Sequence, residues 1–325
     1  MTKKKDAYKV DVDLSDIFTA ERRDSKRPTE RNGMTISQAL EVVVKQMQAA
    51  GLRDRTINDY ITYVSHFGQT TGGLSLDELN VDHIYAWLSS MDVSNATKLI
   101  RLKCLKAFLG RCFNNGWIER NFWRDVKIKV DTPVKEGATD RDIRTLLSLL
   151  DLSDFVQLRD AAAVLTMYQT GLRVGTVVRL ENKHVDLDAQ LFKIGGEIVK
   201  NHEALLLPFD DVLARLFTVL IKQNDRVRHE HNVRNDLLFI TMHGGPIATS
   251  PTNNNIQKRL NKYAREFGLR NINPHALRRG FAKNLLDKGA DLALISKALG
   301  HSDLAVTTRY LHLDREEVAE NLRKY

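Results

Sequence analysis

From Thr35 onward, apolar residues recur with the three- and four-residue spacing of α-helices over most of the chain. The spacing changes only between Gln190 and Pro208, where short apolar runs with strand-like alternation are separated by glycines and a polar turn. At 325 residues, the chain is long enough for about two domains, each with its own core. The sequence therefore predicts a mainly α protein, with a helical N-terminal domain and a mostly helical second domain that carries a small antiparallel β-sheet.

Residues 34–126 are predicted to form a four-helix domain. Thr35 and Gln38 have capping-box spacing at the start of the first helix, whose apolar stripe stops at Gly51. Further helices are expected from about Asp54, from Asp82 and over roughly residues 94–114. The side chains expected to face inward on these three helices are Ile57, Tyr60, Ile61, Val64, Phe67, Ile84, Trp87, Leu88, Leu99, Leu102, Leu105, Phe108, Leu109 and Cys112.

Residues 139–325 are predicted to form the second domain. Thr139 is expected to cap a helix that runs to Leu150, and a helix over Asp154–Gln169 has a strongly apolar centre, AAAVLTMY. The runs LFKI, EIVK and ALLLP predict the strands of the small sheet. Helices are expected to resume at about Asp210, after Thr249, and from Pro274, Leu292 and Ala305.

Two segments outside these domains have no helical stripe. Residues 1–33 have mixed charge and little apolar periodicity, which predicts a basic, flexible N-terminal arm. Residues 127–138 contain Lys127, Lys129 and Lys135 with one proline and one glycine, which predicts an interdomain linker. These lysines fit either a solvated surface or a linker that follows a phosphate backbone.

Composition narrows the class of protein. With 49 Lys and Arg against 41 Asp and Glu, the net charge is +8, which favours polyanionic partners. The sequence has no run of about 18 apolar residues and no signal peptide, so we expect a cytoplasmic protein rather than a membrane or secreted one. Two cysteines, Cys104 and Cys112, are too few for a disulfide framework and are expected in the core. No metal or cofactor is expected.

Four short motifs in the second domain carry reactive side chains. In INPHALRRGFA, Asn273 fits an N-cap and Pro274 the first helical position, which places His275 and Arg278 on one face at a helix N-terminus. Such an end attracts anions, although the motif alone also fits an ordinary capped helix. TGLR contains Arg173, LGHS contains His301, and TTRY contains Tyr310. A tyrosine is a poor nucleophile unless nearby cations stabilise the developing charge.

The set and its order, Arg173, Lys200, His275, Arg278, His301 and Tyr310, resemble the tyrosine recombinases of the phage integrase family. The resemblance covers about residues 34–320, with 34–126 similar to the family's core-binding domain and 139–325 to its catalytic domain. Lys200 has the family's spacing of eight residues to a strand-ending proline, Pro208, whereas Lys193 is a rival on the other side of the Gly-Gly turn. One departure is Thr176, where the family commonly has an acidic residue.

The resemblance implies a chemical role for each of these residues. Tyr310 attacks a scissile phosphodiester to give a 3′-phosphotyrosyl enzyme and a free 5′-hydroxyl, without ATP or metal. Arg173, Arg278 and His301 stabilise the transition state, Lys200 protonates the leaving oxygen, and His275 assists proton transfer from Tyr310. The candidate DNA contacts are Lys98, Arg101, Lys103, Lys106, Lys127, Lys129 and Arg279.

The resemblance also implies partners, and it leaves alternatives open. The two domains close around duplex DNA, and the tail of about residues 311–325 docks on a neighbouring subunit of a homotetramer, or else on its own domain. A DNA-bending or directionality factor is a possible accessory. The expected role is integration and excision of a phage or transposon. The alternatives are resolution of replicon multimers, a monomeric type IB topoisomerase, and a noncatalytic DNA-binding regulator.

Overall fold

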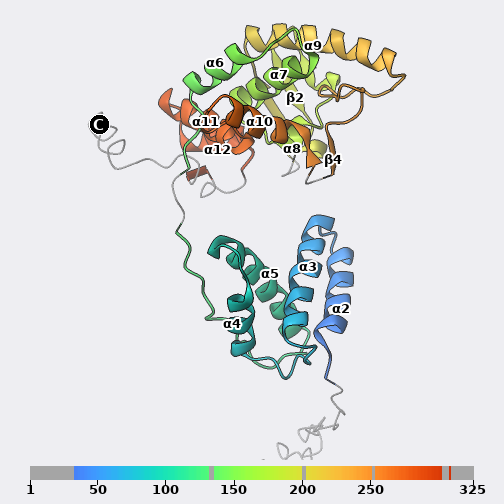
Figure 1. Ribbon diagram of the computed structural model, residues 1–325, viewed down its shortest axis with the longest axis vertical. Helices are drawn as coiled ribbons and strands as arrows, with labels where there is room; N and C mark the ends of the chain where they lie inside the picture. The colour runs from blue at the N-terminus through green and yellow to red at the C-terminus, as the bar shows by residue number, and fades with distance from the viewer. Residues whose placement is uncertain (1–32, 132–134, 200–202, 251–252, 302–306, 309–325) are drawn as a thin grey trace, which may run out of the picture. The chain divides into compact units, whose positions relative to one another are not determined.

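The computed structural model describes residues 33–131, 135–199, 203–250, 253–301 and 307–308 (Figure 1). The chain divides into two compact units, unit 1 (Met1–Asp131) and unit 2 (Thr132–Tyr325). Both described parts are mainly helical, and unit 2 contains a small antiparallel sheet, which confirms the predicted fold class. None of the described helices is both long and apolar enough to cross a membrane.

The described part of unit 1 contains four helices: α2 (Ile36–Ala49), α3 (Asp54–Thr70), α4 (Val81–Ser90) and α5 (Asn95–Asn114). The predicted capping box of α2 is present, because Thr35 accepts a hydrogen bond from the Gln38 backbone and Gln38 accepts one from the Thr35 backbone. The core of the unit is built around Phe67, Trp87 and Phe108, which are fully buried. The prediction for Ile61 is wrong. Its side chain is 40% exposed, because α3 buries a narrower face than its apolar stripe indicated.

Both cysteines lie on α5 and contribute to this core. Cys112 is fully buried, and the half-buried Cys104 packs against the same cluster of side chains. Burial raises the pKa of the Cys112 thiol to about 12 and that of Cys104 to about 11. Both therefore stay protonated at neutral pH and act as small apolar residues.

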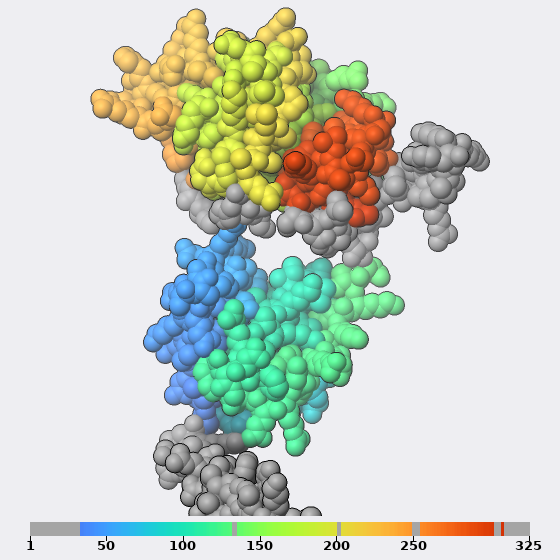
Figure 2. Space-filling view, turned by 180° about the vertical axis from the view of Figure 1, so that it is seen from behind, coloured from blue at the N-terminus to red at the C-terminus, as the bar shows by residue number. Residues whose placement is uncertain are grey.

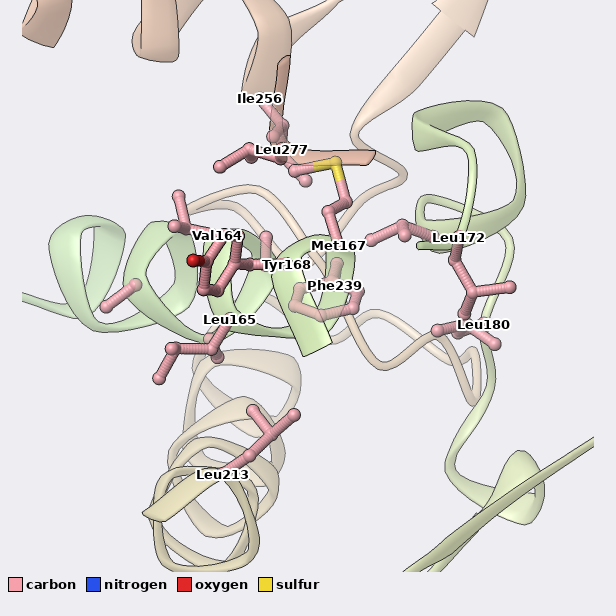
Figure 3. Packing of buried hydrophobic residues seen from close by; sticks show 14 of the residues in the cluster. Val164, Leu165, Met167, Tyr168, Leu172, Leu180, Leu213, Phe239, Ile256 and Leu277 are labelled. Atoms are coloured by element: carbon pink, nitrogen blue, oxygen red, sulfur yellow. The ribbon is translucent and has the colours of Figure 1, made fainter. Parts of the chain in front are cut away.

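Unit 2 is organised around one buried helix. Its helices are α6 (Asp140–Leu149), α7 (Phe155–Thr170), α8 (Val174–Val177), α9 (Asp211–Glu230), α10 (Asn255–Glu266), α11 (Pro274–Asp287) and α12 (Leu292–Ala298). Almost every side chain of α7 from Leu158 to Thr170 is buried. Figure 3 shows Val164, Leu165, Met167 and Tyr168 of α7 packed among Leu213 of α9, Ile256 of α10 and Leu277 of α11. The elements that follow α7 are thus positioned from a rigid centre.

The sheet of unit 2 differs from the prediction in one strand. Its order is β1 (Val185–Asp186), β2 (Leu191–Ile194) and β3 (Leu205–Pro208), all antiparallel, with Leu191 opposite Pro208 and Ile194 opposite Leu205. The run EIVK is not a strand, since Gly196–Ile198 forms the 3₁₀ helix η3 in the connection between β2 and β3. β2 therefore pairs directly with β3. A second pair, β4 (Ala248–Ser250) and β5 (Asn253–Asn254), precedes α10.

A buried cluster of charges joins α7 to α10, and we call Arg159, Asp160, Arg259 and Tyr263 the Asp160 cluster. One carboxylate oxygen of Asp160 accepts hydrogen bonds from Arg159 at 3.1 and 2.6 Å. The other accepts from Arg259 and, at 2.9 Å, from the Tyr263 hydroxyl. Arg159 also donates to the carbonyl of Ile240 at 3.0 Å. Each polar group of the cluster named here is therefore matched by a partner of the opposite type.

Residues 135–138, predicted as part of a linker, pack closely on α11. The Ala138 amide donates to the Ala276 carbonyl at 2.9 Å, and Arg279 Nε donates to the Glu136 carbonyl at 2.9 Å. A Cβ on Gly137 would come within 2.6 Å of the Gly280 backbone, and one on Gly280 within 2.3 Å of the Ala138 carbonyl. Two glycines thus permit a contact between backbones that any side chain would prevent.

Candidate active site

Arg278 lies one turn into α11, near the N-terminus of that helix. Asn273 is the N-cap and accepts a hydrogen bond from the Ala276 amide at 3.0 Å, and Pro274 occupies the first turn. The apolar side of α11 packs on α7, so Arg278, on the same face as Pro274 and Leu277, is only 3% exposed. The side chain therefore enters the protein interior as a desolvated cation at a helix N-terminus.

The Arg278 guanidinium joins three segments that are far apart in the sequence. Nη1 donates to the Gly171 carbonyl just after α7, and Nη2 donates to the Leu299 carbonyl after α12 at 2.6 Å. Nη2 also lies 2.8 Å from Nε2 of His301. Gly171 has a φ of 65°, and a Cβ there would overlap Phe281 and Leu299, so only glycine places this carbonyl correctly. Two of the predicted site residues, Arg278 and His301, are therefore in direct contact.

Arg173 and His275 belong to the same electrostatic environment. Arg173 is the half-buried N-cap of α8, two residues after Gly171, and His275 lies in the first turn of α11. Partial burial, followed by the charges of Arg279, Arg278, Lys135 and Arg173, lowers the pKa of His275 below its usual value. Burial, followed by the charges of Arg278 and Arg173, lowers the pKa of His301 to about 4.

These pKa shifts indicate the kind of ligand that the site suits. Both imidazoles are disfavoured in their charged form because positive charge already surrounds them. At neutral pH, His301 is therefore neutral, and the arginines provide the charge of the site. An oxyanion such as a phosphate has the opposite charge, and two guanidiniums offer the donor geometry that it prefers. Among the described residues, no three His, Cys, Asp or Glu side chains are grouped to hold a metal ion.

Lys200 and Tyr310 lie outside the described residues, so their positions relative to Arg278 stay predictions. The backbone two residues before Lys200 is held in place by hydrogen bonds from two side chains. The Ile198 carbonyl accepts hydrogen bonds from Arg179 Nη2 at 2.6 Å and from Thr176 Oγ1 at 3.4 Å. Lys193, the rival of Lys200, forms a 2.7 Å ion pair with Asp186 within the sheet.

Three polar residues near the site were not predicted to act there. Thr307 is fully buried, and its Oγ1 lies 2.9 Å from Nδ1 of His301. Arg179 and Thr176 connect the turn that carries Arg173 to Ile198, on the way to Lys200. The sequence offered only a weak signal for them, since Thr307 belongs to the TTRY motif and Thr176 drew notice only as a departure from the family pattern.

The candidate DNA contacts on α5 differ in how exposed their side chains are and in the contacts that they make within unit 1. Lys103 is exposed, and Lys98 is partly exposed. Arg101 is half-buried, lies over the ring of Tyr63 and donates to Met91 Sδ at 3.4 Å. Lys106 Nζ donates to the Arg124 carbonyl at 3.0 Å, and partial burial lowers its pKa. Arg101 and Lys106 therefore have a structural contact within unit 1 in addition to any contact with DNA.

The remaining candidates for DNA contact are two lysines near the end of unit 1 in the sequence and one arginine on α11. Lys127 and Lys129 are exposed. Arg279 is partly buried and uses Nε to hold the Glu136 backbone. Arg279 therefore has a structural role in anchoring residues 135–138, in addition to its predicted contact with DNA.

Comparison with known families and proteins adds an independent result. The sequence profile of the phage integrase family matches residues 139–317, which is more than half of the chain. The tyrosine recombinase XerC of Serratia marcescens is 28% identical over 250 residues, covering 77% of this chain and 79% of that protein. The similarity therefore extends beyond unit 2 into unit 1.

The fold is also shared with solved structures. The Tn1549 transposon integrase in complex with a circular intermediate DNA superposes with a TM-score of 0.71 at 18% identity, covering 90% of this chain and all of that one. XerH, a site-specific recombinase bound to a palindromic difH substrate, gives a TM-score of 0.62 at 24% identity, covering 88% of this chain and 83% of that one. Both similarities concern the fold.

Proposed function

The chain belongs to the phage integrase family and is a tyrosine recombinase, and from this premise we propose that Tyr310 cuts and rejoins DNA strands within a site formed with Arg173, Lys200, His275, Arg278 and His301. Tyr310 Oη attacks the scissile phosphorus and the bond to the 5′-oxygen breaks, which leaves a 3′-phosphotyrosyl link and a free 5′-hydroxyl. The link conserves the energy of the broken bond, and attack by a 5′-hydroxyl of the partner strand completes the exchange.

The observation that carries this proposal is the buried contact of Arg278 with His301. The guanidinium is desolvated and held by the Gly171 and Leu299 carbonyls, so its orientation is fixed before a substrate arrives. Fixed donors stabilise the charge of a pentacoordinate transition state without reorganisation, which is usually the largest catalytic contribution. Arg173, on the turn after Gly171, is the second cation for the same phosphate.

Proton transfer follows from the charge state of the remaining groups. His275 has a lowered pKa, so its neutral imidazole can accept the proton of Tyr310 at neutral pH. Lys200 is the proposed general acid that protonates the leaving 5′-oxygen. The hydrogen bonds from Arg179 and Thr176 to Ile198 support this role by fixing the chain just before Lys200.

Covalent trapping tests the nucleophile. Wild-type protein and the Tyr310→Phe variant are incubated with nicked duplex fragments that cover the DNA around the gene, and adducts that survive denaturation are measured. We expect adducts with the wild type only, and nearly equal DNA binding by the two proteins. Adducts that persist in the Tyr310→Phe variant would disprove the assignment, and specific binding without any adduct would favour a noncatalytic regulator.

A modified leaving group tests Lys200 against Lys193. A substrate with sulfur in place of the bridging 5′-oxygen needs no general acid, because a thiolate leaves without protonation. We expect Lys200→Ala to cleave ordinary DNA at least 100-fold more slowly than the wild type and to regain its rate on the sulfur substrate. Lys193→Ala should cleave both substrates like the wild type. The reverse result would transfer the role to Lys193.

The biological reaction that we propose is integration and excision of a phage or transposon in the bacterial cytoplasm, with an accessory DNA-bending or directionality factor. The similarity to the transposon integrase supports this role, and the similarity to XerC supports the alternative, resolution of replicon multimers. Sequencing of DNA junctions in cells that express the chain separates them. Junctions between a mobile element and the chromosome support the first role, and conversion of plasmid dimers to monomers supports the second.

For assembly, we propose a homotetramer on DNA in which residues 311–325 of one copy dock on unit 2 of the next. Unit 2 has a mostly apolar groove of about 530 Å³ between α6, α7 and α11, lined in part by Leu147, Val212 and Leu285. Figure 2 shows the red surface of α11 and α12 and the yellow surface of the segments around β3 on one face of unit 2. The proposed occupant lies outside the described residues and supplies four apolar side chains, Leu311, Leu313, Val318 and Leu322.

Truncation and a groove variant test this assembly together. We expect truncation after Leu313, or Val212→Arg at a residue that is 56% exposed, to prevent tetramer formation on DNA without preventing cleavage by a bound protomer. Mass photometry on a DNA fragment with two binding sites gives the number of subunits. If truncation leaves the tetramer and recombination unchanged, the tail docks on its own domain instead.

A further inference from the structure

His301 uses both of its ring nitrogens in hydrogen bonds. Nε2 lies 2.8 Å from Arg278 Nη2, and Nδ1 lies 2.9 Å from Thr307 Oγ1. A guanidinium has only donors, so Nε2 must accept from Arg278. A neutral imidazole carries a single N–H, which must then be on Nδ1 and must donate to the Thr307 hydroxyl. The hydrogen-bond partners thus fix one tautomer of His301 in the absence of a substrate.

The same contacts occupy Nη2 of Arg278. This nitrogen has two hydrogens, and they are directed at the Leu299 carbonyl and at His301 Nε2. A phosphate oxygen that binds Nη2 has to replace one of these acceptors. The carbonyl belongs to the backbone at the end of α12, where Leu299 is buried, and cannot turn away by itself. The imidazole is therefore the acceptor that yields to the phosphate.

Once it is released by Arg278, His301 cannot donate to the phosphate in its present tautomer, because Nε2 has no hydrogen. Nε2 has to gain a proton and Nδ1 has to lose one. A hydroxyl can serve both states, since it accepts from Nδ1–H in the first and donates to the bare Nδ1 in the second. Thr307 supplies such a hydroxyl, and it is fully buried, so water does not readily take its place.

We propose that Thr307 is a positioning residue that allows His301 to exchange tautomers when a phosphate oxygen binds Arg278. His301 is only partly buried, so water can carry the protons: one leaves Nδ1, one is taken up by Nε2, and the Thr307 hydroxyl rotates from acceptor to donor. The charge of the imidazole does not change. This inference rests on the proposed function, in which Arg278 and His301 bind the scissile phosphate, and it assigns Thr307 a task in that site.

The exchange gives the site two states. In the first, Arg278 donates to His301, so a desolvated cation and a partly buried imidazole share a hydrogen bond while no substrate is present. In the second, both donate to the same oxyanion. Thr307 lies three residues before Tyr310 in the sequence, so the group that sets the tautomer belongs to the segment that supplies the nucleophile.

Nitrogen NMR reads the tautomer directly. The full-length protein is labelled with ¹⁵N-histidine, the His301 signals are assigned by their loss in His301→Gln, and spectra are recorded without and with orthovanadate. Protonated and bare imidazole nitrogens differ widely in ¹⁵N chemical shift. We expect the proton on Nδ1 in the free protein and on Nε2 with vanadate. A proton that stays on Nδ1, or an imidazolium with both nitrogens protonated, would overturn the inference.

Variants at position 307 separate the hydroxyl from the shape of the side chain. Thr307→Ser keeps the hydroxyl and should exchange tautomers like the wild type. Thr307→Val keeps the branched shape without a hydroxyl, and we expect no exchange and vanadate binding at least tenfold weaker. The matched control is Thr308→Val at the adjacent exposed threonine, which should behave like the wild type. Full exchange in Thr307→Val would show that the hydroxyl is unnecessary.

The outcome is separable from that of the proposed function. If the wild type forms a Tyr310-dependent adduct with DNA but His301 keeps its tautomer, the inference about Thr307 is wrong and the recombinase site stands. If the tautomer exchanges with vanadate but DNA that the protein binds specifically gives no adduct, the oxyanion site is real and the assignment of Tyr310 is wrong.

Discussion

Arg159 and Arg278 lie in the same unit and are each 3% exposed, but their surroundings differ. Arg159 shares a carboxylate with Arg259 in the Asp160 cluster, so a negative charge lies directly beside it. The contacts of Arg278 include two carbonyls and a neutral imidazole. Carbonyls fix the orientation of a cation without neutralising it. We therefore propose that Arg159 contributes to stability and that Arg278 binds an anion.

The largest effect that tests this comparison is on folding. Asp160→Ala removes the carboxylate and leaves the buried Arg159 and the partly exposed Arg259 without it. Breaking a buried ion pair in this way costs about 3–5 kcal/mol, so we expect a loss of that size in the free energy of unfolding of unit 2. Urea denaturation followed by circular dichroism measures it. Asp186→Ala, which breaks the partly exposed pair with Lys193, is the control and should cost much less. Similar losses in the two variants would contradict the comparison.

The next effect is on catalysis. Arg278→Met keeps the length of the side chain and removes its charge, so we expect DNA cleavage to fall about 10²- to 10³-fold, as for loss of one fixed transition-state donor. Because the desolvated charge disappears together with its hydrogen bonds, the protein should lose less stability than with Asp160→Ala. Single-turnover cleavage of a nicked substrate and urea denaturation give the two values. A variant that cleaves within tenfold of the wild type would show that Arg278 has a structural role like that of Arg159.

Arg179 gives an intermediate case, since it is exposed and donates to the carbonyls of Gly175 and Ile198. We expect Arg179→Ala to slow cleavage of ordinary DNA about tenfold, because a charged hydrogen bond worth about 1.5–3 kcal/mol no longer fixes the chain before Lys200. The defect should shrink on the sulfur leaving-group substrate, which needs no general acid. An equal defect on both substrates would mean that Arg179 supports the turn of Arg173 instead.

The smallest effect is on the pH dependence of stability. The pKa of His301 is about 4 in the folded chain and about 6.5 when unfolded, so between these values the unfolded chain binds more protons. The free energy of unfolding therefore falls as the pH is lowered from about 6.5 to 4. We expect His301→Gln to fall less steeply than the wild type in this window. Equal slopes in the two proteins would show that neither burial nor the nearby cations lower the pKa of His301.

Helices and caps were predicted well from the sequence because their causes are local. The capping boxes at Thr35 and Thr139, the N-cap Asn273 and the buried centre of α7 all follow from residue types and spacings within one turn. The strand prediction for EIVK was wrong because apolar alternation over four residues does not decide pairing. Pairing also depends on the partner strand, and β2 pairs with β3.

The residues of the candidate site were named from motifs, but their contacts were not predictable. No spacing in the sequence indicates that Gly171, Leu299 and His301 would surround Arg278, since these contacts span 107, 21 and 23 positions. Thr307 and Arg179 were missed for the same reason. Threonine and arginine are common surface residues, and only the tertiary fold turns them toward His301 and Ile198.

The close packing of Gly137 on Gly280 has a mechanical consequence. The chain that enters unit 2 meets α11 first, through the Glu136 carbonyl, the Ala138 amide and the two glycines. A force that acts along the backbone from unit 1 therefore reaches α11, through these contacts, before it reaches α6. That helix begins at Pro274 and carries His275 and Arg278 in its first turns. Tension between the units is thus delivered to the helix that holds the proposed phosphate-binding residues.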